Sequence, residues 1–188
     1  ESGRQGNAVR ELARVHPPLG DVTGDFAAEL ADAAEAAGAT IRLGLEHEVV
    51  LYGPEAFDLP PALQQLADGP AVTSCPGTTW CKRGIADSRA AELNIREVLP
   101  NGKDLSICIS GCPNNCAHAA VADVGLTGRT RTIDGETVAG FRLLAGGNGG
   151  RGPELAQEVA AFVPADEVTA AVTQLVTEGR SDDEAGGV

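Results

Sequence analysis

Five cysteines constrain this chain more than any other feature, because four of them form two short-range pairs. Cys75 and Cys81 are separated by five residues, and Cys112 and Cys116 are separated by three. Two thiolate pairs on either side of a helix-sized segment can surround a zinc ion or an iron–sulfur cluster. Structural zinc sites favour shorter spacings at both ends, so the longer first pair suits a wider cluster. The sequence therefore predicts a metal centre and favours an iron–sulfur cluster over zinc.

The residues around the second pair predict how its thiols are presented. Pro113 suits the first position of a helix, which would place Cys112 and Cys116 one turn apart on the same face. The free backbone N–H groups of such a helix start favour a thiolate or a cofactor carboxylate nearby. Asn114 and Asn115 could cap this helix or donate hydrogen bonds to cluster sulfur or cofactor oxygens.

The motifs that contain the cysteines resemble those of a known family. C-P-G-x-x-x-C is followed by S-G-C-P-N-x-C and then by A-D-V-G-L-T-G. This order resembles the carboxyl-terminal half of the siroheme-dependent nitrite and sulfite reductases, over roughly residues 15–178. The resemblance implies that Cys75, Cys81, Cys112 and Cys116 bind a [4Fe-4S] cluster. It also implies that Cys116 is shared with the siroheme iron as its axial ligand.

The pattern of apolar residues predicts an α+β fold. Thr23 can cap a helix that ends near Gly38, and the segments 40–45 and 47–52 are predicted strands. A helix followed by two strands is a ferredoxin-like half-unit, and it resembles the repeat that precedes the cluster domain in the siroheme reductases. We therefore expect a ferredoxin-like half-unit followed by a mixed-sheet siroheme/[4Fe-4S] domain with flanking helices. The predicted parts are a connecting arm at 1–19, the half-domain at 20–70, the cluster domain at 71–178 and a flexible acidic tail at 179–188.

Further elements follow from periodicity and turn residues. Cys108 falls in a predicted strand over 104–110, which favours a buried free thiol over a fifth metal ligand. Asp134 and Gly135 predict a hairpin turn between strands at 130–133 and 137–144. The remaining predicted helices span 7–15, 62–67, 81–98, 153–162 and 164–177.

Basic residues near the cysteines are the candidate anion-binding groups. Lys82, Arg83 and Arg89 lie on the first half of the predicted helix after Cys81, where they could neutralise siroheme carboxylates or the reacting anion. In the half-domain, Arg42 is the candidate for binding an anion, with an ordinary sheet-surface arginine as the alternative. The acidic residues that follow Arg42 depart from the family's pattern, because they would repel nitrite, sulfite and macrocycle carboxylates alike.

The composition bears on the class of partner and on the cellular setting. The net charge of −13 argues against nucleic acid or an anionic membrane as the partner. The odd number of cysteines, with no secretory signal and no apolar run of ~18 residues, predicts a reducing, cytoplasmic setting. The chain has no methionine and begins at Glu1, which we interpret as a fragment, a processed chain or a separate half of a longer protein.

The resemblance implies an oxidoreductase module that passes electrons from the cluster through Cys116 to siroheme, for reduction of nitrite or sulfite. The electron donor would be ferredoxin or a flavoprotein, and an amino-terminal half or partner subunit would complete the active site. Two alternatives stay open. The chain could be an iron–sulfur electron-transfer subunit without catalysis of its own, or an enzyme similar to precorrin-3B synthase.

Overall fold

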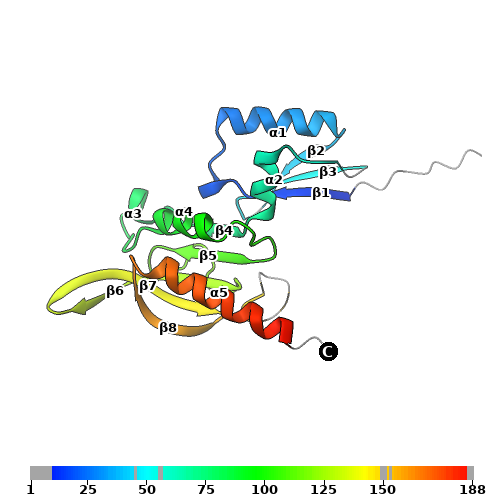
Figure 1. Cartoon of the computed structure of the whole chain (residues 1–188). Coiled ribbons are helices and arrows are strands. Elements are labelled where there is room, and N and C mark those ends of the chain that lie inside the picture. Colours follow the sequence, from blue (N-terminus) through cyan, green and yellow to red (C-terminus); the bar gives the residue numbers. More distant parts are fainter. Residues whose placement is uncertain (1–9, 45, 55–56, 149–151, 153, 186–188) are drawn as a thin grey trace, which may run out of the picture.

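The computed structural model describes residues 10–44, 46–54, 57–148, 152 and 154–185, and these residues form two β-sheets flanked by helices (Figure 1). The first sheet has three strands in the order β1-β3-β2, and the second has five in the order β4-β5-β6-β7-β8. This α+β architecture, a small sheet followed by a mixed sheet, confirms the predicted fold class. Within the described ranges, no helix is long and apolar enough to cross a membrane.

The first sheet is antiparallel and packs against two helices. Thr23 caps the first of these helices as predicted, because its Oγ1 accepts a hydrogen bond from the N–H of Phe26 at 3.2 Å. Leu30 from this helix packs with Leu51 of the central strand and with Leu63 of the second helix. The elements are β1 (Arg10–Val15), α1 (Gly24–Ala36), β2 (Thr40–Leu43), β3 (Val49–Gly53) and α2 (Pro61–Asp68).

Strand β1 corrects the helix predicted at 7–15. Residues 10–15 pair antiparallel with β3, with Val15 opposite Val49, and residues 7–9 lie outside the described residues. Val15 is fully buried in the core of the first sheet. Pairing with a strand more than thirty residues away overrides the weak local helical pattern, so this stretch is part of the first sheet.

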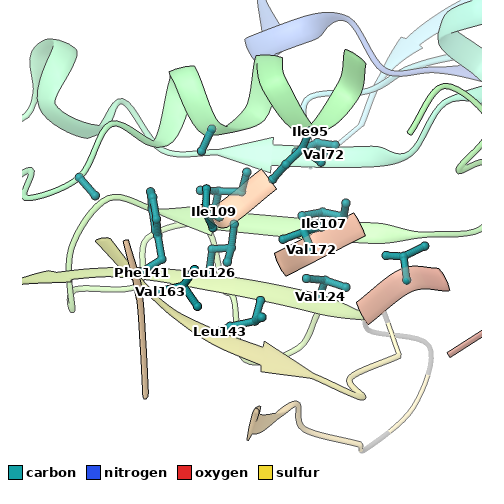
Figure 2. Packing of buried hydrophobic residues seen from close by; sticks show 14 residues of the cluster. Val72, Ile95, Ile107, Ile109, Val124, Leu126, Phe141, Leu143, Val163 and Val172 are labelled. Atoms are coloured by element: carbon teal, nitrogen blue, oxygen red, sulfur yellow. The ribbon is translucent and has the colours of Figure 1, made fainter. Parts of the chain in front are cut away.

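The second sheet is mixed, with β4, β5 and β6 parallel and β6, β7 and β8 antiparallel. Two helices pack on one face. Figure 2 shows Ile95 of the helix at 88–98 and Val172 of the helix at 168–185 among side chains of the sheet such as Ile107, Ile109 and Leu126. The elements are β4 (Ala71–Ser74), α4 (Ser88–Val98), β5 (Ser106–Ser110), β6 (Val124–Ile133), β7 (Glu136–Ala145), β8 (Gln157–Pro164) and α5 (Val168–Ala185).

The β6–β7 hairpin forms as predicted. Asp134 and Gly135 have φ angles of 51° and 85°, the left-handed values that a tight hairpin turn of this type requires. The tip of the hairpin extends past the neighbouring strands (Figure 1). Ile133, opposite Glu136 at the turn, is more than one-third exposed. The outer half of the hairpin therefore stands clear of the hydrophobic core.

Three further predicted helices differ from the structure. The segment predicted as a helix at 153–162 is largely the strand β8, which pairs with β7 and buries Val163 opposite Phe141; residue 153 lies outside the described residues. The helix predicted from Cys81 begins only at Ser88, because Asp87 caps it by accepting the N–H of Ala90. The helix predicted at 164–177 is α5, which starts at residue 168 and continues to residue 185 through much of the predicted tail.

His16 makes the stability of the chain depend on pH. It is only 7% exposed, and its Nδ1 has no hydrogen-bond partner among the described residues. Burial, together with the charge of Arg96, lowers the pKa of His16 to about 4. An unfolded histidine has a pKa of about 6.5, so the unfolded chain binds a proton that the folded chain does not. Stability is therefore lost as the pH falls from about 6.5 toward 4.

Between pH 7 and pH 4.5, we expect the His16→Gln chain to lose about 2 kcal/mol less stability than the unsubstituted chain loses. Urea unfolding of both chains at the two pH values measures this difference. The carboxylates titrate in both chains, so their effect cancels in the comparison. Equal losses in the two chains would contradict the prediction.

Candidate metal centre

The four paired cysteines follow two neighbouring parallel strands. Cys75 comes directly after β4, and Cys112 comes two residues after β5. The two strands are paired up to Ser74 and Ile109, and the N–H of Cys75 donates to the carbonyl of Ile109 at 3.0 Å. The carboxyl ends of parallel strands meet at one edge of a sheet. The loops that carry the two pairs therefore begin side by side.

Hydrogen bonds hold these loops together around Gly111. Its N–H donates to Cys75 Sγ at 3.1 Å, and its carbonyl accepts from the N–H groups of Ile85 and Ala86 at 2.8 and 3.0 Å. A β-carbon at Gly111 would lie 2.8 Å from the carbonyl oxygen of Ala86 and 2.8 Å from the Cα of Gly77, so only glycine permits this approach. The segments that carry the first and the second pair are thus packed against each other.

Two further features fix the first pair. The short helix α3 (Gly77–Trp80) leads directly to Cys81, whose N–H donates to the carbonyl of Gly77 at 3.0 Å. Ser88, fully buried at the start of α4, donates from Oγ to the carbonyl of Cys75 at 2.7 Å and lies 3.7 Å from its Sγ. Helix α4 is therefore anchored to the cysteine that follows β4.

The paired thiols are the kind of donor that binds an iron–sulfur cluster. All four are free of disulfide bonds; Cys112 is buried, Cys75 is partly exposed, and Cys81 and Cys116 are exposed. Among the described side chains, no three of His, Cys, Asp or Glu converge closely enough to hold one metal ion. The donor set, four thiols on adjoining loops, fits a [4Fe-4S] cluster.

The loop between β5 and β6 corrects the helix predicted after Pro113. Residues 111–123 form successive turns, in which Asn115 and His118 have φ angles of 54° and 57° that no α-helix permits. The loop crosses the sheet on the face opposite α4 and α5, where Ala117 and Ala119 pack with Cys108. A turn-rich crossover thus replaces the helix that usually connects parallel strands.

Cys108 is the buried free thiol that the strand pattern predicted. It lies on β5, is 7% exposed, and packs among small apolar side chains. Burial raises the pKa of Cys108 to about 12, and the carboxylates of Glu46 and Asp123 add to the effect. Burial in this apolar cluster therefore disfavours the thiolate form that a metal ligand requires.

The predicted cationic residues are in different situations. The Arg89 guanidinium lies 4.7 Å from the centroid of the Trp80 ring and pairs with Asp21 at 2.8 Å, so it is already engaged. Lys82 and Arg83 are exposed in the turns between α3 and α4, next to Cys81. Arg42 lies on β2 in the first sheet, 5.5 Å from the ring centroid of Tyr52, and lines an open cleft there.

Asn114 is exposed in the loop between Cys112 and Cys116. Ser88 and Ser110 are the site residues that sequence reasoning missed, because a buried serine carries no pattern that distinguishes it from a surface serine. The sequence also gave no indication of the close backbone packing at Gly111. Only Asn115 had a local signal, since asparagine is the side chain that best tolerates the left-handed backbone.

The fold and the site together define an α+β protein that presents two thiol pairs at the carboxyl edge of a mixed sheet. Residues 68–182 match the family model described as the nitrite and sulphite reductase 4Fe-4S domain. Residues 4–69 match the nitrite/sulfite reductase ferredoxin-like half domain. The chain belongs to the nitrite and sulfite reductase family, as its motifs predicted.

Individual relatives agree with this assignment. The chain is 29% identical to the ferredoxin–nitrite reductase of Synechococcus elongatus, over 93% of this chain and 37% of that protein. It is 30% identical to the assimilatory ferredoxin-dependent nitrite reductase of Haloferax mediterranei, over 84% of this chain and 30% of that protein. The chain thus spans about a third of the length of these relatives.

Solved structures show the same fold. The NirA protein of Mycobacterium tuberculosis superimposes with a TM-score of 0.65 and 24% identity, over 87% of this chain and 34% of that one. Dissimilatory sulfite reductase I superimposes with a TM-score of 0.64 and 12% identity, over 87% of this chain and 60% of that one. At these identities the likeness supports the architecture alone.

Proposed function

We propose that this chain is the cluster-binding part of a siroheme-dependent nitrite reductase. Cys75, Cys81, Cys112 and Cys116 would hold a [4Fe-4S] cluster, and Cys116 would also bind the siroheme iron. When bound, the cluster and the siroheme supply electron transfer to a small oxyanion. The observation that carries the proposal is that both thiol pairs follow adjacent parallel strands within the stretch that matches the 4Fe-4S domain.

The chain's own residues have defined tasks in this proposal. The N–H of Gly111 donates to Cys75 Sγ and so helps to orient this thiol. Exposed Lys82 and Arg83 beside Cys81 would bind siroheme carboxylates or the oxyanion, and Asn114 would donate a hydrogen bond to the cofactor. Arg89 would act less directly, because Trp80 and Asp21 already hold its guanidinium. Arg42 would contribute positive charge from the first sheet.

The names of the relatives support nitrite as the substrate and ferredoxin as the electron donor. Sulfite and a flavoprotein donor are the corresponding alternatives. Because the relatives are about three times as long, further parts of the active site would come from the rest of a longer protein or from a partner subunit. Free thiols that bind a cluster suit a reducing compartment such as the cytoplasm.

Anaerobic reconstitution of the chain with iron and sulfide tests the cluster directly. We expect about four iron and four sulfide atoms per chain. Trp80 is the sole tryptophan, is 70% exposed, and immediately precedes Cys81, so its fluorescence should be quenched as the cluster forms. Siroheme added to the reconstituted chain should then bind and give the visible absorption spectrum of protein-bound siroheme. Binding of a single zinc ion in preference to iron and sulfide would contradict the proposal.

A second candidate is an iron–sulfur electron carrier without catalysis of its own. It is favoured by the engagement of two candidate cations, since Arg42 stacks on Tyr52 and Arg89 pairs with Asp21. Nitrite and sulfite reduction driven by reduced methyl viologen discriminates between the two, because turnover by the isolated chain would exclude a pure carrier. The nitrite reductases among the relatives favour a reductase over an enzyme similar to precorrin-3B synthase.

A further inference from the structure

We propose that Ser110 and Asn115 are positioning residues that hold Cys112 and Cys116 ready for metal binding. The inference rests on the proposed function of the paired cysteines. Both side chains hydrogen-bond to the backbone of the loop that carries these thiols. They therefore act on the metal centre through the shape of the loop.

A compact hydrogen-bond network fixes this shape. Ser110, the fully buried last residue of β5, accepts the N–H of Ala117 at its Oγ at 3.0 Å. The same Oγ lies 3.3 Å from Asn115 Oδ1, to which its hydroxyl donates. Asn115 Oδ1 also accepts the N–H of Ala119 at 2.9 Å. Cys116 lies between Asn115 and Ala117, so its backbone is fixed on both sides.

Asn115 contributes its backbone as well as its side chain. Its φ of 54° is left-handed, and its N–H donates to the carbonyl of Cys112 at 3.2 Å. This turn reverses the chain between the two cysteines. A residue with a β-carbon normally avoids such a backbone, and asparagine tolerates it best after glycine. Asn115 thus supplies both a tolerated left-handed turn and an acceptor oxygen.

The network is shielded from water by the packing of the loop on the sheet. Ala119 is fully buried, and Ala117 is nearly so, where they pack with Cys108. A backbone N–H that loses its acceptor in such surroundings is left unsatisfied, and the loop must then move to regain a partner. Loss of either side chain should therefore displace Cys116 without touching a thiol.

Three substitutions at Asn115 separate its two contributions, and all are made in the full 188-residue chain. Asn115→Gly keeps the left-handed turn and loses the acceptor; Asn115→Asp keeps both; Asn115→Ala loses both. Ser110→Ala removes the other half of the network. Far-ultraviolet circular dichroism and thermal unfolding of the metal-free chains establish that each variant folds.

The measurement is the rate at which a chelator removes iron from the reconstituted chain. We expect Asn115→Ala and Ser110→Ala to release iron about 10 to 100 times faster than the unsubstituted chain, as for other groups that orient metal ligands. Asn115→Gly should be intermediate, and Asn115→Asp should restore slow release. The electron paramagnetic resonance signal of the reduced cluster should broaden in the fast-releasing variants and sharpen again in Asn115→Asp.

Ser106→Ala is the matched control. Ser106 Oγ accepts the N–H of Asp123 at 2.9 Å, a bond of the same kind at the opposite end of the same loop. It should release iron at the rate of the unsubstituted chain. Equal acceleration by Ser106→Ala and Ser110→Ala would overturn the inference, as would a folded Asn115→Ala chain with normal release. If Asn115→Ala does not fold, faster release from Asn115→Gly than from Asn115→Asp supports the inference, and equal rates overturn it.

These experiments distinguish failure of the proposed function from failure of the positioning role. Failure of the unsubstituted chain to take up iron and sulfide would reject the proposed function itself. Normal uptake by the unsubstituted chain, with no effect of the substitutions at 110 and 115, would reject the positioning role alone.

Discussion

Replacing Cys116 with serine is expected to remove the cluster, whereas replacing Cys108 with serine is expected to leave it in place. Both thiols lie within one stretch of chain that runs from β5 into the loop, but Cys116 is exposed and Cys108 is buried. Serine binds iron far more weakly than a thiolate, so iron in Cys116→Ser should fall to about a tenth or less of that in the unsubstituted chain. Iron and sulfide analysis after reconstitution measures the difference.

The Cys108→Ser variant is the control for this experiment. The Cys108 thiol is buried, and its raised pKa, about 12, disfavours the thiolate form that a ligand requires. A hydroxyl buried among alanines should cost about 1 to 2 kcal/mol of stability, which is small enough for the chain to stay folded. Comparable iron loss in the two variants would show that the ligand assignment is wrong. Binding of siroheme should be lost only in Cys116→Ser.

The elements that were predictable carry their signal in a few adjacent residues. Thr23 caps α1 by its own side chain, and Asp134 and Gly135 make the hairpin turn by their own backbone preferences. The paired cysteines were equally recognisable, because their spacing lies within short segments. Alternation along β5 separated Cys108 from Ile107 and Ile109, and this placed the free thiol correctly.

The elements that were not predictable depend on partners distant in the chain. β1 and β8 have helix-like local patterns, and each becomes a strand because an exposed edge of β3 or β7 is available to pair with it. The loop after Cys112 escaped prediction for a different reason. A proline followed by two asparagines suits a helix start as well as a left-handed turn, and only the acceptors offered by Ser110 and Asn115 decide between them.

One contact between the two parts of the chain, which the sequence did not predict, is made by the buried carboxylate of Glu92. This side chain on α4 is fully buried, and its Oε1 accepts the N–H of Leu19 at 2.7 Å and the Nε of Arg96 at 2.9 Å. Leu19 belongs to the 3-10 turn η1 (Pro18–Gly20), where its φ of 62° is left-handed. Arg96 in turn donates to the carbonyl of Val72 at 3.1 Å.

Glu92→Ala is therefore expected to destabilise the chain by about 3 to 5 kcal/mol, because it leaves the Arg96 charge and the Leu19 N–H buried without their acceptor. Glu92→Gln keeps a carbonyl oxygen for Leu19 and loses only the charge, so its loss should be smaller. Urea unfolding of the metal-free chains measures both. Glu11→Ala is the matched control, since its ion pair with Arg14 is substantially exposed, Arg14 keeps Glu48 as a partner, and the pair should contribute at most about 1 kcal/mol. If Glu92→Ala cost no more than Glu11→Ala, the carboxylate would not join the two sheets energetically, and other contacts such as the Arg89–Asp21 ion pair would hold the chain near η1 to α4.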